Sequence, residues 1–116
     1  MAISVKRAYE EPSVDDGYRV LVDRIWPRGI SKEKAQLDEW LKEVAPSNQL
    51  RKSYHSGAIS WDEFRKQYLS DLKRHRDDLR PLAERAKNEK VTLVFSSKNL
   101  QHNNAVVLKQ YVEMLD

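Results

Sequence analysis

Two short apolar runs, separated by a long stretch of helical patterns, constrain the fold of this chain more than any other feature. The first spans residues 18–22 and the second Val91–Phe95, and both are rich in the β-branched and aromatic residues that strands favour. The first becomes almost continuously apolar toward its end, as expected of a strand that is covered on both faces. Helices between two such strands predict a parallel pair with a helical crossover, and therefore an α/β fold.

A further strand is expected near the N-terminus, where Ile3 and Val5 flank Ser4. The segment that joins it to Tyr18 is rich in turn-forming residues and too short for a full crossover helix. The first two strands are therefore either antiparallel or not adjacent. The chain is expected to form a single domain, residues 1–116, with a small three-stranded, mostly parallel sheet flanked by about four helices.

A capping serine and an apolar stripe predict the first helix. Ser31 is a good N-cap, and Glu33 would lie in the first turn. The residues that follow at i, i+3, i+4 and i+7 form one amphipathic face, and the helix must end before Pro46. That face consists of Leu37, Trp40, Leu41 and Val44. Ser47 is expected to cap a short helical turn through Leu50.

Three more helices are predicted between residue 60 and the C-terminus. Ser60 and Glu63 fit a capping box, and Pro81 is placed in the first turn of a helix capped by Asp77 or Asp78. The last helix is capped by His102 or Asn103. The expected buried stripes are Trp61, Phe64, Tyr68 and Leu72, then Leu82, Ala83 and Ala86, and then Leu108, Tyr111, Val112 and Leu115.

Composition excludes several classes of protein. The chain has no Cys, which removes disulfides and thiolate metal sites. No apolar run reaches the roughly 18 residues that a membrane span needs, and the first residues lack the apolar segment of a signal peptide. A soluble, cytoplasmic protein with no membrane partner is expected. No metal site is predicted, since the three His lack the i, i+4 pairing of helical metal sites, and no cofactor motif is present.

The charge balance favours an anionic partner only weakly. There are 21 Lys and Arg against 18 Asp and Glu, and the pI is about 9.2. The charges are mixed along the chain, whereas dedicated nucleic-acid binders show a more one-sided patch. The basic run at residues 73–76 is followed at once by Asp77 and Asp78, which favours a solvated helix face. A small anionic ligand is therefore preferred, nucleic-acid binding or a regulatory role is the alternative, and the oligomeric state is left open.

Polar residues follow both central strands, at the edge of the sheet where open α/β sheets bind ligands. Arg and Lys side chains and the N–H groups at a helix start are suited to a phosphate or a carboxylate. The predicted ligand-binding residues are Arg24, Trp26, Arg28, Arg51, Lys98, His102, Asn103 and Asn104. Asp23 and His102 are the candidates for a general acid or base. No partner at a fixed spacing supports either, so whether the protein is an enzyme is left open.

The same residues also have structural interpretations. Asp23 and Arg24 could pair with each other or with neighbours, and Asp23 could offset the positive charges without any ligand. Trp26 could pack in a corner of the chain. Asn103 and Asn104 could serve only as a helix cap. The binding hypothesis therefore depends on these residues converging, and a ligand site further requires an open cavity.

Several segments resemble the signatures of the YeaO-like proteins, a bacterial family of unknown function. They are residues 16–29 (DGYRVLVDRIWPRG), 40–47 (WLKEVAPS), 50–51 (LR) and 102–108 (HNNAVVL), and the resemblance covers almost the whole chain. It implies a small, soluble, single-domain protein with no established reaction. The positions carried over are Asp23, Arg24, Trp26, Pro27, Arg28, Gly29, Pro46, Ser47, Arg51, His102, Asn103 and Asn104. One departure, at Ser96 and Ser97 before Lys98, argues against a catalytic role for either serine.

Overall fold

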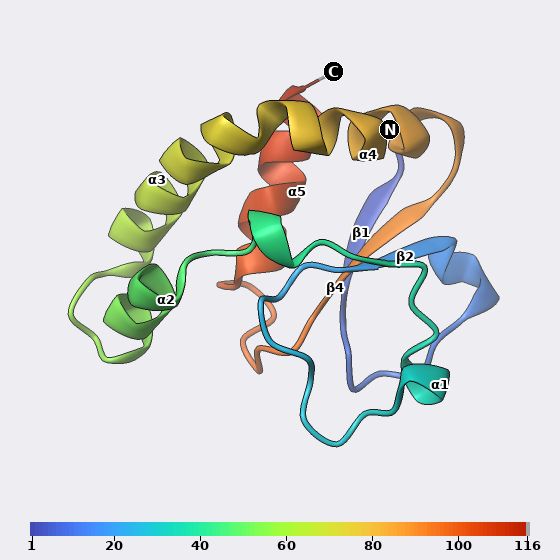
Figure 1. Ribbon diagram of the computed structural model, residues 1–116, viewed down its shortest axis with the longest axis horizontal. Coiled ribbons are helices and arrows are strands. Elements are labelled where there is room, and N and C mark those ends of the chain that lie inside the picture. The colour runs from blue at the N-terminus through green and yellow to red at the C-terminus, as the bar shows by residue number, and fades with distance from the viewer. Residues whose placement is uncertain (116) are drawn as a thin grey trace.

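Four parallel strands form one sheet in the computed structural model, which describes residues 1–115 (Figure 1). The strands are β1 (Ile3–Arg7), β2 (Tyr18–Leu21), β3 (Glu39–Trp40) and β4 (Val91–Phe95). Their order across the sheet is β1-β4-β2-β3. The predicted parallel pairing of β2 with β4 is confirmed, and β1 and β2 are not adjacent because β4 lies between them.

Five α-helices lie in the described part of the chain, four of them eight residues or longer. They are α1 (Lys32–Ala35), α2 (Asn48–His55), α3 (Trp61–Leu72), α4 (Arg76–Asn88) and α5 (Asn104–Met114), with 3-10 turns at Val14–Asp16, Lys42–Val44 and Lys73–His75. Figure 1 shows α3 and α4 following one another along one side of the molecule, with α5 beside them. The predicted α/β class is confirmed, although the sheet has four strands and not three.

Alternate residues of the central strands pack on opposite faces of the sheet. Val20 and Val22 in and after β2, with Leu93 of β4, join the large core that the helices cover. Leu21 and Val94 point to the other face and join a small cluster with Ala8. Trp26, Ile30, Leu37 and Trp40 pack against that small cluster. One face of the sheet is therefore covered by helices, and the other mainly by the segment between β2 and β3.

The predicted N-caps are confirmed at four helices. The side-chain oxygens of Ser31, Ser47, Ser60 and Asn103 each accept a hydrogen bond from a backbone N–H in the first turn of the helix that follows. Of the two N-cap candidates for α5, His102 and Asn103, the structure has Asn103. The helix after Ser47 runs to His55, well beyond the predicted single turn. Of the expected core residues, Phe64, Val94 and Leu108 are buried.

The long helix predicted after Ser31 is wrong. The chain leaves α1 at Gln36, which has a left-handed backbone (φ 47°), and then pairs with β2 as the edge strand β3. The apolar spacing suggested one helix face, but the residues that form it belong to two different clusters. Leu37 and Trp40 pack on the small cluster, whereas Leu41 packs on the large one. Trp40 is consequently only half-buried, and its prediction as a fully buried core residue is also wrong.

Pro81 lies inside α4 and not in its first turn. The helix begins at Arg76, directly after the 3-10 turn that continues α3, so Asp77 and Asp78 occupy the first turn and cap nothing. The predicted cap is wrong because the helix starts directly after the 3-10 turn, so that His75 (φ −106°, ψ 16°) occupies the N-cap position, with no capping hydrogen bond from its side chain. Pro81 is exposed, so the carbonyl group that lacks its usual N–H partner can bond to water.

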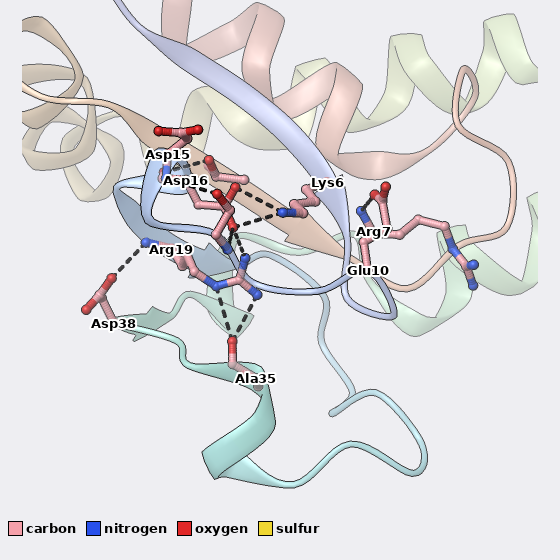
Figure 2. Close-up of polar contacts among 10 residues, drawn as sticks. Lys6, Arg7, Glu10, Asp15, Asp16, Arg19, Ala35 and Asp38 are labelled. Carbon is pink, nitrogen blue, oxygen red and sulfur yellow. Dashed lines mark hydrogen bonds and ion pairs between the residues drawn. The ribbon is translucent and has the colours of Figure 1, made fainter.

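A buried ion pair anchors the start of β2 (Figure 2). Asp16 Oδ2 lies 2.6 Å from the NH1 atom of Arg19, and both residues are buried, with 7% and 4% of their surfaces exposed. Lys6 Nζ lies 3.1 Å from the same carboxylate, which also accepts the N–H of Ser13. Arg19 donates its remaining bonds to the carbonyl oxygen of Ala35. The network thereby joins β1, β2 and α1.

We expect this network to make the fold acid-sensitive. Burial by itself raises the pKa of the Asp16 carboxyl, but hydrogen bonds from Ser13, Lys6 and Arg19 outweigh it and hold the pKa below its usual value. A carboxyl whose pKa is lower in the folded state stabilises the fold fully above its unfolded pKa of about 3.9. That stabilisation is lost as the pH falls from there toward the folded pKa.

The measurement is urea unfolding of the wild type and Asp16→Asn between pH 7 and pH 3. The difference in unfolding free energy should stay constant from pH 7 to about pH 5 and shrink below about pH 4. A difference that persists unchanged to pH 3, or grows, would contradict the lowered pKa.

Candidate functional site

A cavity of about 550 Å³ opens at the carboxyl ends of β2 and β4. The loop after β2, the loop after β4, the start of α5 and one side of α2 form its walls. All eight residues predicted to bind a ligand line it, together with Asp23: these are Arg24, Trp26, Arg28, Arg51, Lys98, His102, Asn103 and Asn104. The structure thus brings the predicted set together around open space, while their binding of a ligand stays a prediction.

Several lining residues were not among the predicted ligand-binding residues, although the family signature includes Pro27 and Pro46. They are Arg7, Tyr9, Ile25, Pro27, Pro46, Tyr54, His55, Phe64, Ser96 and Ser97. Arg7 ends β1, whose neighbour in the sheet was left open, so nothing placed it at the same edge as the other two strand ends. Tyr54 and His55 lie one turn beyond Arg51 on α2, and the helical spacing from Arg51 was the available signal.

Asp23 lines the cavity and bonds to neutral groups, and it forms no ion pair with a cation within residues 1–115. Its Oδ2 atom accepts hydrogen bonds from the N–H and the hydroxyl of Ser96, at 2.9 and 2.6 Å. Its Oδ1 atom accepts one from Asn104 Nδ2 at 3.0 Å, and the same amide nitrogen donates to the carbonyl oxygen of Val22. Within residues 1–115, Asp23 and Arg24 do not pair with each other, and each bonds to other neighbours, which is the second form of the structural interpretation. Asp23 instead joins the strand ends to the start of α5.

Three of the predicted residues have clear structural roles. Arg24 donates to the carbonyl oxygens of Pro46 and Ala45. Trp26 donates from Nε1 to the carbonyl oxygen of Ile30 at 2.6 Å, and its ring lies edge-on to Trp40 with centroids 5.5 Å apart. Asn103 caps α5. The packing and capping interpretations therefore hold for these side chains, although all three also line the cavity.

Of the remaining cations, Arg28, Arg51 and Lys98 form fewer contacts than Arg24 within residues 1–115. Arg51 Nε is buried and has no hydrogen-bond partner within residues 1–115. The side chains of Arg28 and Lys98 are exposed and form no ion pair in that part of the chain. Arg7 is held by the carbonyl oxygens of Ser96 and Ser97. With histidines neutral, five cationic side chains and one carboxylate line the cavity, a formal excess of four positive charges.

Aromatic rings form a second kind of surface in the cavity. Tyr54 and Phe64, from α2 and α3, pack with centroids 4.9 Å apart, and both line it. His102 stacks on Trp61 at 4.6 Å with an interplanar angle of 8°. Of these two rings, His102 lines the cavity and Trp61 does not.

No group of three or more His, Asp or Glu side chains between residues 1 and 115 is arranged to hold a metal ion. None of the helices in that range combines the length and apolar character required to cross a bilayer.

Residues 2–115 match the sequence profile of the family described as the inactive DUF488-N3 subclade, and the chain belongs to this family. It is 45% identical over 115 residues to the uncharacterized protein YeaO of Escherichia coli, and the aligned region covers 99% of this chain and 100% of YeaO. The uncharacterized proteins Mb3100c of Mycobacterium bovis and Rv3073c of Mycobacterium tuberculosis are each 41% identical over 111 residues, 93% of this chain and 91% of theirs. The resemblance to the YeaO-like proteins is thereby confirmed. No solved structure matches the chain.

Proposed function

We propose that this protein binds a small phosphate- or carboxylate-bearing molecule in the cavity at the carboxyl ends of β2 and β4. The observation that carries the proposal is Arg51, whose buried Nε has no partner within residues 1–115. A buried donor on a charged group costs free energy when it is left unpaired, and a bound anion would recover that cost.

The charge distribution around the cavity supports the same ligand class. Five cations face one carboxylate in a space of about 550 Å³, and that carboxylate, Asp23, is already occupied by Ser96 and Asn104. Positive charges held close together repel one another unless an anion lies between them. Helix α5 also begins at this cavity, and the N-terminal end of a helix carries partial positive charge.

A binding role is favoured over catalysis. The family is described as inactive, and neither candidate for proton transfer is well arranged for it. Asp23 already accepts three hydrogen bonds from neighbouring groups. His102 is exposed, and within residues 1–115 no side chain bonds to its ring nitrogens to orient them.

Calorimetric titration with pyrophosphate and with citrate tests the proposal. At least one of these anions should bind the wild type, and Arg51→Gln or Arg28→Ala should weaken that binding by roughly ten- to a hundredfold, the usual worth of a hydrogen bond to a charged group. The melting temperature of free Arg28→Ala should stay nearly unchanged because the wild-type side chain is exposed and forms no ion pair within residues 1–115.

Lys52→Gln is the matched control for this experiment. Lys52 adjoins Arg51 on α2, is exposed and does not line the cavity. Its replacement by Gln therefore removes the same charge as Arg51→Gln, but from outside the site. Its affinity for either anion should equal that of the wild type. Equal losses in Lys52→Gln and Arg51→Gln would indicate a diffuse charge effect, and the absence of binding by both anions would refute the proposal.

Nucleic-acid binding is the second candidate, favoured by the pI of about 9.2 and by the basic run at residues 73–76. That run is partly offset, because Arg74 pairs with Asp71 at 3.0 Å and His75 lies 3.3 Å from Asp78. A salt titration separates the two candidates. Affinity for a nucleic acid falls steeply with salt in proportion to the phosphates neutralised, whereas a ligand held in a cavity loses much less.

A further inference from the structure

The cavity combines two surfaces that few small molecules match together. One is cationic, with Arg28, Arg51 and Lys98 free of ion pairs within residues 1–115. The other consists of flat rings, with Tyr54 and His102 both lining the space. A simple anion such as phosphate or citrate would engage the first surface and leave the rings facing water. An occupant with one planar aromatic ring system and one anionic group satisfies both.

The two surfaces meet on α2. Arg51 and Tyr54 are three residues apart in that helix and therefore lie on the same side of it. Tyr54 packs on Phe64, and through Trp61 the aromatic group continues to His102. The ring contacts are thus continuous from Tyr54 to His102, although Trp61 itself does not line the cavity. Arg51, whose buried Nε has no partner within residues 1–115, adjoins Tyr54.

His102 offers the clearest position for a planar ring. Its imidazole is held parallel to Trp61 at 4.6 Å, so the side chain is already oriented before any ligand arrives. His102 also lines the cavity. Stacking of a nucleobase on an aromatic side chain adds roughly 5- to 150-fold to affinity, and it tolerates any base because every base has a planar face.

We propose that the cavity binds a nucleoside 5′-monophosphate, with its base on the aromatic surface at His102 and Tyr54 and its phosphate among Arg28, Arg51 and Lys98. The inference rests on the proposed function and names its ligand class. A phosphate carries close to two negative charges, which suits a formal excess of four positive charges better than a single carboxylate does. A cavity of about 550 Å³ has the size of a site for one small ligand and not for a nucleic-acid strand.

Calorimetric titration of the full chain with AMP, GMP, CMP and UMP, and with ribose 5-phosphate, tests the inference. At least one nucleotide should bind roughly 5- to 150-fold more tightly than ribose 5-phosphate. His102→Ala should remove most of this preference, because it should weaken the binding of the nucleotide by a larger factor than the binding of ribose 5-phosphate. His102→Phe, which keeps a flat ring, should retain the preference, and His75→Ala, outside the cavity, should behave as the wild type.

The failures of the two proposals are distinguishable. If ribose 5-phosphate binds as tightly as all four nucleotides, the aromatic surface recognises no base and this inference is overturned, while anion binding stands. If neither the nucleotides, ribose 5-phosphate, pyrophosphate nor citrate binds, both proposals fail. A nucleotide preference that survives in His102→Ala contradicts the placement of the base. Tighter binding of a 5′-phosphorylated tetranucleotide than of any mononucleotide would overturn the free nucleotide as the ligand and indicate the 5′ end of a nucleic-acid strand instead.

Discussion

Replacing Asp16 by Ala should lower the free energy of unfolding by about 3–5 kcal/mol, the usual cost of removing one partner of a buried ion pair. The reason is the charge left behind: Arg19 is only 4% exposed, and its NH1 atom would lose the carboxylate that lies 2.6 Å away. Lys6 and the N–H of Ser13 would lose the same acceptor. Urea unfolding at pH 7 measures the change.

Asp15→Ala is the matched control for Asp16→Ala, since its side chain is exposed and lies next to the network without joining it. It should change stability by less than about 0.5 kcal/mol. Adding Arg19→Met to Asp16→Ala should restore much of the lost stability, because it removes the buried charge that has no partner. If Asp16→Ala alone costs less than about 1 kcal/mol, the ion pair does not stabilise the fold as argued, since breaking a buried pair costs more than that.

Replacing Phe64 by Ala should cost about 3–5 kcal/mol, the range for truncating a buried Phe in a core. Phe64 is 4% exposed and packs against Tyr54, Trp61 and Tyr68, so truncation opens a void where α2 and α3 meet. Thermal and urea unfolding both report the loss.

Gln67→Ala provides the control on the same helix, because Gln67 is exposed on α3 and its replacement should be nearly neutral. Phe64 also lines the cavity, so ligand binding should weaken in Phe64→Ala as well. Phe64→Leu keeps most of the buried volume and should cost clearly less. A melting temperature unchanged in Phe64→Ala would show that the core between α2 and α3 does not depend on this ring.

The candidate site was predictable to the extent that it follows from the parallel pairing of β2 and β4. Parallel strands end at the same edge of a sheet, so the residues after β2 and those after β4 had to lie near one another. Arg7 and Tyr9 reach that edge only because β1 pairs with the far side of β4. Phe64 reaches it only because α3 packs beside α2. Neither arrangement leaves a signal in local sequence.

A glycine illustrates the same limit in the fold. Gly17 precedes β2 with φ 64°, and a Cβ atom there would overlap the carbonyl oxygen of Lys90. That oxygen accepts the N–H of Tyr18 at 2.9 Å, so the close approach is part of the register between β2 and β4. The sequence shows a glycine at a turn, but the contact that requires it lies across the sheet.

By itself, the sequence determined the features that depend on neighbours along the chain. These are the strands β1, β2 and β4, the caps at Ser31, Ser47, Ser60 and Asn103, and the apolar stripes of α3 and α5, in which only Trp61 and Leu115 are partly and not fully buried. Capping and periodicity operate within a few residues. Only the tertiary structure decided that Glu39–Trp40 forms an edge strand. The free N–H and C=O groups along β2 offer hydrogen bonds there, and a helix through Trp40 would have placed Leu37 and Leu41 on one face although they pack in different clusters. It also decided that Arg19 is buried, since a charge leaves water only when folding supplies a partner such as Asp16.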